Sequence, residues 1–141
     1  MKVLARKSVT QSHGTGCAVA CCAYVLGLTY QKALKLFSRP HQAWGRGFYC
    51  REIVEALSAV QMKYSYCYLK QKKSHLLSVP GTIVYVVDPN QYPLGHYLVR
   101  TPQGDWMNPW SNFPVITPAK SSFQRRLPGE AKYAIFPLND K

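Results

Sequence analysis

Apolar positions in the first half of the chain recur with the spacing of helices. The pattern predicts three helices, over residues 17–26, 30–37 and about 50–60. Gly27 stands where a helix commonly ends, and Thr29 is a suitable N-terminal cap for the second helix. The segment between the second and third helices is rich in glycine and aromatic residues, so we expect a loop there.

The period of the pattern changes after the third predicted helix. Short β-branched or aromatic runs, bounded by Pro, Gly or Asn, predict strands over 64–68, 82–87, 96–101, 105–108 and 133–136. The tripeptide Pro102-Gln103-Gly104 predicts a hairpin turn between two of these strands. Helices followed by antiparallel strands indicate an α+β fold, and a length of 141 residues indicates a single domain, 1–141.

Composition narrows the class of protein. Apolar residues make up 47% of the chain, yet no run approaches the roughly 20 residues that span a bilayer, and no secretory signal is expected. Five cysteines, with Cys21 and Cys22 adjacent, do not suggest a disulfide framework, so reduced thiols and a cytoplasmic location fit better. Without a Cys-x-x-Cys pair or clustered histidines, we expect no metal and no cofactor.

The formal net charge of +12 favours an anionic partner, either nucleic acid, an acidic protein or an anionic membrane surface. A solvated basic surface without a specific partner explains the same charge. The stretch 63–73 interleaves tyrosines with lysines, a combination that suits single-stranded nucleic acid. A half-buried strand followed by a basic turn is the other interpretation of this stretch.

Cys17 has the most distinctive setting of the five cysteines. A polar, Gly-rich approach precedes it, and the first predicted helix begins at it. The helix dipole and the unpaired N–H groups of a first turn favour the thiolate, which is the nucleophilic form. A buried cysteine that serves as a small apolar residue is the alternative.

A cysteine nucleophile needs a base, and His96 is the candidate. We expect it to open a strand directly after a loop over 88–95. Across the predicted hairpin, Asn108 lies within about two positions of facing His96, where an amide could orient the imidazole. Asp105 is the acidic alternative, but it lies near the turn, about five residues away at ~3.3 Å per residue.

The charge that develops on an attacked carbonyl oxygen needs hydrogen-bond donors. The backbone N–H of Cys17 is one candidate, and the side-chain amide of Gln11 is another if the intervening loop turns back. Gly14 and Gly16 would permit such a return. Taken alone, Gln11 would be an ordinary surface glutamine.

These residues together resemble a family. Gln-x5-Cys at the head of an apolar helix, a later His-Tyr-Leu-Val strand and a strand ending in Asn-Pro are similar to papain-like cysteine peptidases, most closely the bacteriocin-processing, double-glycine branch and its stand-alone relatives. The resemblance implies a papain-like fold, a peptide or protein substrate, Cys17 as nucleophile, His96 as general acid/base, Asn108 as its orienter and Gln11 as oxyanion donor.

The chain departs from that family around two of its site residues. The family usually has Asp-Cys-Gly at the nucleophile, where this chain has Gly16-Cys17-Ala18, and Asp-Pro at the orienter, where it has Asn108-Pro109. Three functions therefore remain open: a cysteine peptidase or amidase that hydrolyses or transfers an acyl group, a nuclease-like protein on the same scaffold, and a non-catalytic binding module.

Overall fold

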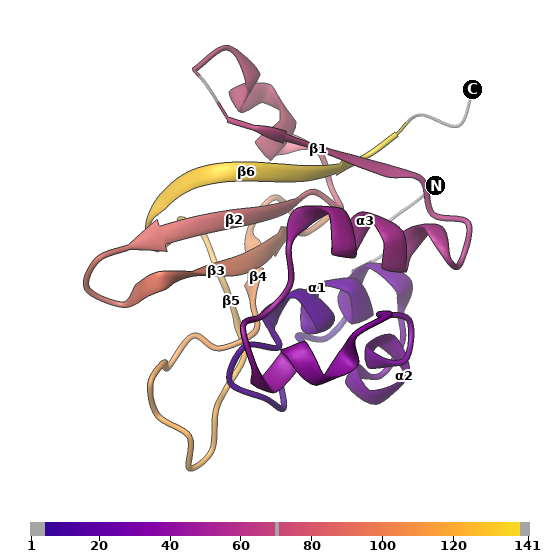
Figure 1. Ribbon diagram of the computed structural model, residues 1–141. Coiled ribbons are helices and arrows are strands. Elements are labelled where there is room, and N and C mark those ends of the chain that lie inside the picture. The colour runs from indigo at the N-terminus through magenta and orange to yellow at the C-terminus, as the bar shows by residue number, and fades with distance from the viewer. Residues whose placement is uncertain (1–4, 70, 139–141) are drawn as a thin grey trace.

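A computed structural model describes residues 5–69 and 71–138 of the chain, and its architecture is α+β. Helices come first, as predicted (Figure 1): α1 Cys17–Leu26, α2 Tyr30–Leu34 and α3 Cys50–Ser58. The second and third are shorter than predicted. The expected loop between them contains a 3₁₀ helix, η1 Pro40–Trp44.

Local chemistry explains where the helices begin and end. The α1 helix ends at Gly27, whose N–H bonds to the carbonyl of Ala23, and the Thr29 hydroxyl accepts the N–H of Lys32 at 3.2 Å to cap α2. At the start of α3, the Glu52 carboxylate reaches back to the N–H of Tyr49 at 2.8 Å. Each bond satisfies a backbone group that a helix end would otherwise leave unpaired.

Six strands form one antiparallel sheet in the order β1-β6-β2-β3-β4-β5. Their bounds are β1 Tyr64–Tyr68, β2 Ile83–Asp88, β3 Tyr92–Arg100, β4 Trp106–Asn108, β5 Ser122–Gln124 and β6 Glu130–Pro137. Five strands were predicted and β5 was not, because three residues are too few to show an alternating pattern. A second 3₁₀ helix, η2 Gln71–Ser78, lies between β1 and β2. Part of the basic stretch 63–73 falls outside the described residues, namely Lys70 and the side chains of 71–74.

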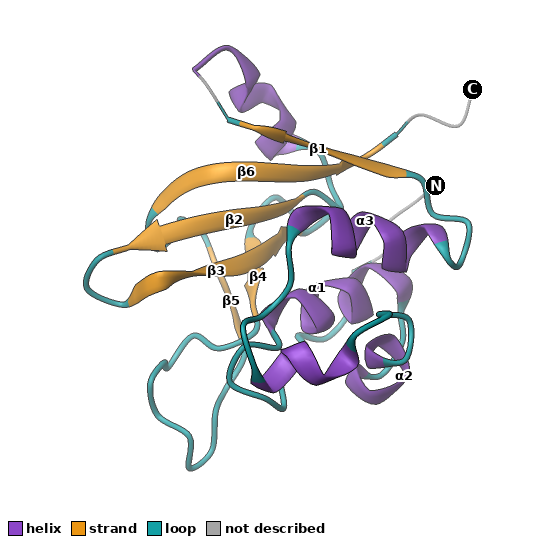
Figure 2. Cartoon of the chain, in the orientation of Figure 1, coloured by secondary structure: helices purple, strands orange, loops and turns teal. Residues whose placement is uncertain are grey.

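The three α-helices cover one face of the sheet, as Figure 2 shows. The core lies between them, and α1 is buried almost all round because α2, α3 and the sheet enclose it. Cys21 and Cys22 are fully buried within α1 and pack as small apolar residues. A smaller apolar cluster around Val84, Val86, Leu98 and Trp106 covers the opposite face.

The start of β3 corrects a prediction. The loop predicted over 88–95 is reduced to a turn at 89–91, and His96 does not open the strand, because β3 begins at Tyr92. The register shifts between the pairs Val86–His96 and Asp88–Tyr92, so β3 carries a bulge over 93–95. Proline and glycine had indicated a loop here, but a bulge accommodates both.

Close packing beneath this bulge fixes the backbone that leads into His96. The Tyr85 hydroxyl donates to the carbonyl of Leu94 at 2.8 Å. Gly95 has a φ of +91° and lies so close to the Tyr85 ring that a Cβ would overlap it. Only glycine meets both conditions without strain.

Within the described ranges, no helix has the length and apolar character needed to cross a membrane. All five cysteines are unpaired.

Candidate active site

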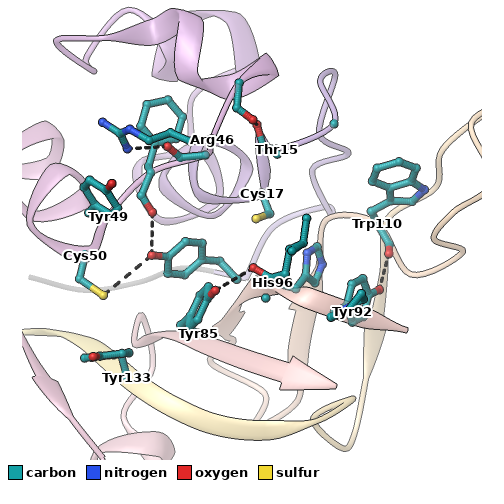
Figure 3. Close-up of a pocket in the computed structure, with 18 of the residues that line it drawn as sticks. Thr15, Cys17, Arg46, Tyr49, Cys50, Tyr85, Tyr92, His96, Trp110 and Tyr133 are labelled. Carbon is teal, nitrogen blue, oxygen red and sulfur yellow. Dashed lines mark hydrogen bonds between the residues drawn. The ribbon is translucent and has the colours of Figure 1, made fainter. Parts of the chain in front are cut away.

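A cleft of about 570 Å³ lies between the helices and the sheet. The loop before α1 and the segment 45–51 form one wall, and β1, β2, β3, β6 and the chain after β4 form the other. Both Cys17 and His96 line this cleft, and Figure 3 shows the Cys17 sulfur pointing toward the sheet. The structure therefore brings the two predicted site residues into one cavity from segments about eighty residues apart.

Cys17 is the first residue of α1, and its side chain is almost completely buried. Burial raises the pKa of the Cys17 thiol to about 11, although the backbone N–H groups of Tyr97, Ala18 and Cys17 itself lower it. The backbone donors at the helix start thus lower the pKa of this thiol as expected, but the loss of solvent outweighs them, so the net shift is opposite to the one predicted. Tyr97 directly follows His96, so its N–H places the thiol beside the histidine-bearing strand.

The loop that precedes Cys17 contacts both the segment around Ala43 and the Tyr30 side chain of α2. The Thr15 N–H donates to the carbonyl of Ala43 at 2.9 Å, and the Thr15 hydroxyl lies 2.8 Å from the same carbonyl. Gly16 lies against the hydroxyl of Tyr30, where a Cβ would overlap that oxygen. His13 Nδ1 lies 3.0 Å from the same hydroxyl. These contacts fix the point at which α1 begins.

Gln11 does not lie where the sequence predicted it. It is buried, but its amide nitrogen donates to the loop carbonyls of His13 at 2.9 Å and Gly14 at 3.2 Å. Both amide protons are engaged by the loop, and Gln11 does not line the cleft. Its Oε1 is buried and has no hydrogen-bond partner in the part of the chain that the structure describes. In this geometry Gln11 braces the loop before Cys17 and does not donate into the site.

His96 and Asn108 are in contact as the hairpin prediction required. His96 Nε2 lies 2.7 Å from Asn108 Oδ1, and both side chains are buried. Val99 pairs with Met107, which places Asn108 two positions from facing His96. Burial lowers the pKa of His96 to about 4, although the hydrogen bond to Asn108 raises it. The imidazole is therefore neutral at neutral pH.

Three hydrogen bonds besides the one to His96 fix the orientation of the Asn108 amide. Its nitrogen donates to Gln124 Oε1 at 2.8 Å and to the Tyr92 hydroxyl at 3.3 Å, while its oxygen accepts the N–H of Trp110 at 3.0 Å. The oxygen must therefore face His96, so His96 carries its proton on Nε2. This tautomer is assigned from the hydrogen-bond network. It leaves the Nδ1 lone pair free to take a proton.

Tyr92 shields the pair from water. Its ring stacks on the His96 ring at 4.1 Å between centroids and 3° between planes. Its hydroxyl donates to the carbonyl of Trp110 at 2.5 Å, which holds the ring in place. The stacked ring is one source of the burial that lowers the pKa of His96.

Asp105, the acidic alternative to Asn108, lies at the turn of the hairpin. Its carboxylate accepts a hydrogen bond from the Thr101 hydroxyl, within the same turn. The predicted turn is present, since the Gly104 N–H bonds to the carbonyl of Thr101 at 3.1 Å. Asp105 thus has a local role and does not contact His96.

Two residues of this network were missed at the sequence level. Tyr92 fell in the segment expected to be a loop, and Gln124 lies on the unpredicted strand β5. Gln124 is itself fixed, since its amide nitrogen donates to the carbonyl of Arg126 at 2.7 Å. It lies diagonally across β4–β5 from Asn108. No local signal marks such a residue, but recognising β5 would have placed it beside Asn108.

The thiol and the imidazole face the same space without being bonded. Among the described residues, no hydrogen bond joins Cys17 Sγ to His96. Catalytic hydrogen bonds are often long in unliganded sites and tighten around substrate. Within residues 5–69 and 71–138, no group of three or more His, Cys, Asp or Glu side chains is placed to hold a metal ion.

No model of a protein family matches the chain, and no curated protein is significantly similar to it. The function must therefore be argued from the site itself.

Proposed function

We propose that this protein is a papain-like cysteine peptidase or amidase. Cys17 is its nucleophile, His96 its general acid and base, and Asn108 the residue that orients the imidazole. The observation that carries the proposal is the fixed His96–Asn108 pair, with an unprotonated Nδ1, in the same cleft as a thiol at a helix start. This arrangement also supports a papain-like version of the α+β fold.

The raised pKa of Cys17 and the lowered pKa of His96 describe a neutral thiol beside a neutral imidazole. The thiol proton therefore moves to His96 Nδ1 as the sulfur attacks the carbonyl carbon. The carbonyl oxygen takes up negative charge in the tetrahedral intermediate. The His96 imidazolium then donates its proton to the leaving amine, the C–N bond breaks, and a thioester on Cys17 remains.

The second half of the reaction reverses these roles. His96 removes a proton from water, the resulting hydroxyl adds to the thioester carbon, and the C–S bond breaks as the thiolate recovers its proton. The products are a carboxylic acid and the free thiol. An amine that replaces water as the acceptor would make the reaction an acyl transfer.

The oxyanion donor that fits this geometry best is the backbone N–H of Cys17. It belongs to the first turn of α1, where N–H groups have no partner within the helix. Gln11 supports this donor indirectly, because its amide holds the carbonyls of the loop that fixes the start of α1.

Specific observations also favour the two other functions. Tyr66 and Tyr68 are exposed along β1, which with the net charge of +12 suits a nucleic-acid partner. The raised pKa of Cys17, and the lack of a bond to His96 among the described residues, suit a binding module that lacks catalysis.

The test is cleavage of a peptide library prepared from a whole-cell protein digest, with new chain ends identified by mass spectrometry. We expect the native chain to produce new ends at a consistent sequence and Cys17→Ala to produce none. Equal sets of products from the two proteins would refute the proposal. Circular dichroism of Cys17→Ala checks that it remains folded.

A further inference from the structure

The cleft extends well beyond Cys17 and His96, and aromatic and basic residues dominate its lining. Nine of the residues that line it are aromatic. Two are arginines, Arg46 and Arg51, and none of the described lining residues is Asp or Glu. A hydrolytic site needs only a few groups around the attacked carbonyl, so this extended lining calls for a separate explanation.

A row of four tyrosines crosses the sheet on the side of the cleft. Tyr97, Tyr85, Tyr133 and Tyr68 come from the four neighbouring strands β3, β2, β6 and β1, and each is the direct register partner of the next. Successive ring centroids are 5.0, 6.3 and 5.3 Å apart. The row leads from the residue whose N–H contacts the Cys17 thiol to the edge of the sheet.

The inner and outer halves of this tyrosine row differ. The hydroxyl of Tyr97 donates to the carbonyl of Phe48, and that of Tyr85 donates to the carbonyl of Leu94, so both rings are fixed within the fold. Tyr133 lines the cleft and is 36% exposed, and Tyr68, which is 51% exposed, continues the row beyond the cleft lining. Exposed tyrosines in contact offer apolar ring surface together with hydroxyls, which suits contact with another molecule.

The opposite wall presents Arg51, which forms no direct ion pair with a carboxylate of residues 5–69 and 71–138. Tyr49 lies between the guanidinium groups of Arg46, at 4.1 Å, and Arg51, at 5.1 Å. Glu52 binds Arg46 through both carboxylate oxygens, at 2.8 and 3.0 Å, and neutralises it. Arg51 has no carboxylate partner among the described residues, although it lines the cleft and stacks on Tyr49.

We infer that the cleft selects a peptide segment with aromatic side chains and an acidic residue, with its rings on the exposed tyrosines and its carboxylate on Arg51. This inference rests on the proposed function, since it names the substrate of that same cleft. A peptide fits better than a nucleic-acid strand because one unpaired guanidinium matches one carboxylate. A phosphate backbone needs cations along its whole length.

The test uses a random decapeptide phage library selected on Cys17→Ala, which binds without turnover. We expect enrichment of Asp or Glu together with Tyr, Phe or Trp. A synthetic fluorescein-labelled copy of an enriched peptide should bind about tenfold more tightly than its acid-to-lysine counterpart. Adding Arg51→Glu should reverse this preference.

Arg39→Glu provides the matched control. Arg39 is exposed and lies outside the cleft, so this change alters the net charge equally and should leave the preference intact. The inference is wrong if selection yields no acidic enrichment, or if Arg39→Glu and Arg51→Glu act alike. A 20-residue oligothymidylate that binds Cys17→Ala and displaces the peptide would instead identify a nucleic-acid cleft.

These outcomes separate the two proposals. If Cys17→Ala binds acidic peptides through Arg51 but the native chain cleaves none, the cleft has the inferred selectivity and the catalytic proposal fails. If the native chain cleaves peptides without acidic preference, the catalytic proposal stands and the selectivity inferred here is wrong.

Discussion

Cys17 and Cys50 share nearly every local feature but differ in what faces them. Each is the first residue of a helix, each lines the same cleft, and burial raises the pKa of both thiols. Figure 3 shows Cys50 at the left of the view and Cys17 nearer its centre, on the side of His96. The polar side-chain contact of Cys50 is the Tyr97 hydroxyl, 3.8 Å from its sulfur.

This difference shows what a helix start can and cannot do. A first turn offers unpaired N–H groups to both sulfurs, so it cannot by itself make one of them a nucleophile. The sheet makes the distinction, because β3 carries an imidazole that β4 and β5 hold in one tautomer. The contrast between the two cysteines can be tested at several levels.

The largest expected effect on catalysis comes from removing the proposed nucleophile, Cys17. Cys17→Ala should lower kcat/KM for peptide cleavage by at least about a thousandfold, because it removes the thiol that we propose attacks the substrate. Cys50→Ala should change it by less than about threefold. Comparable losses in both variants would show that the two thiols are not functionally distinct.

The next effect concerns the residue that orients the imidazole. Asn108→Ala should lower kcat/KM by about ten- to a hundredfold, because His96 loses its fixed tautomer. It should also cost roughly 2–4 kcal/mol in urea unfolding, because buried groups of His96 and Trp110 and a half-buried group of Gln124 lose their partner. Asn90→Ala, at an exposed turn position, is the control and should alter neither quantity.

The lowered pKa of His96 predicts a pH dependence of stability. The unfolded chain binds a proton at His96 near pH 6.5, whereas the folded protein resists it until about pH 4. The stabilisation is therefore complete above pH 6.5 and is lost as the pH falls toward 4, by up to about 1.4 kcal/mol per pH unit. In urea melts, His96→Gln should flatten this slope, and His41→Gln, at an exposed position, should leave it unchanged.

The smallest expected effect on catalysis comes from Gln124, which helps to keep His96 in one tautomer. Gln124→Met removes one acceptor of the Asn108 amide while keeping a side chain of similar length, and kcat/KM should fall only severalfold. The ¹⁵N NMR spectrum of His96 should show a proton on Nε2 in the native chain and a mixture of tautomers in Gln124→Met. The same ratio of the two His96 tautomers in both proteins would rule out Gln124 as a positioning residue.

The parts of the fold that the sequence predicted well depend on neighbours along the chain. The helix start at Cys17, the cap at Thr29 and the hairpin that joins His96 to Asn108 follow from periodicity and turn chemistry. Each of these is decided within about a dozen residues, and a single sequence records such patterns directly.

The errors arose where distant segments decide the outcome. The thiol pKa of Cys17 depends on how deeply the sheet buries it, and the amide of Gln11 depends on how the next loop folds. Tyr92 and Gln124 contribute through a bulge and a three-residue strand that leave almost no pattern. Composition and spacing cannot report such contacts because they depend on the tertiary fold.

The most direct test of the Cys17–His96 pair uses p-nitrophenyl acetate, an activated ester that needs no specific recognition. We expect a burst of p-nitrophenolate, an acetyl group located on Cys17 by peptide mass mapping, and a much slower burst in His96→Gln. Acetylation of Cys50 or Cys67 with Cys17 unmodified, or a burst that is equally fast in His96→Gln, would contradict it.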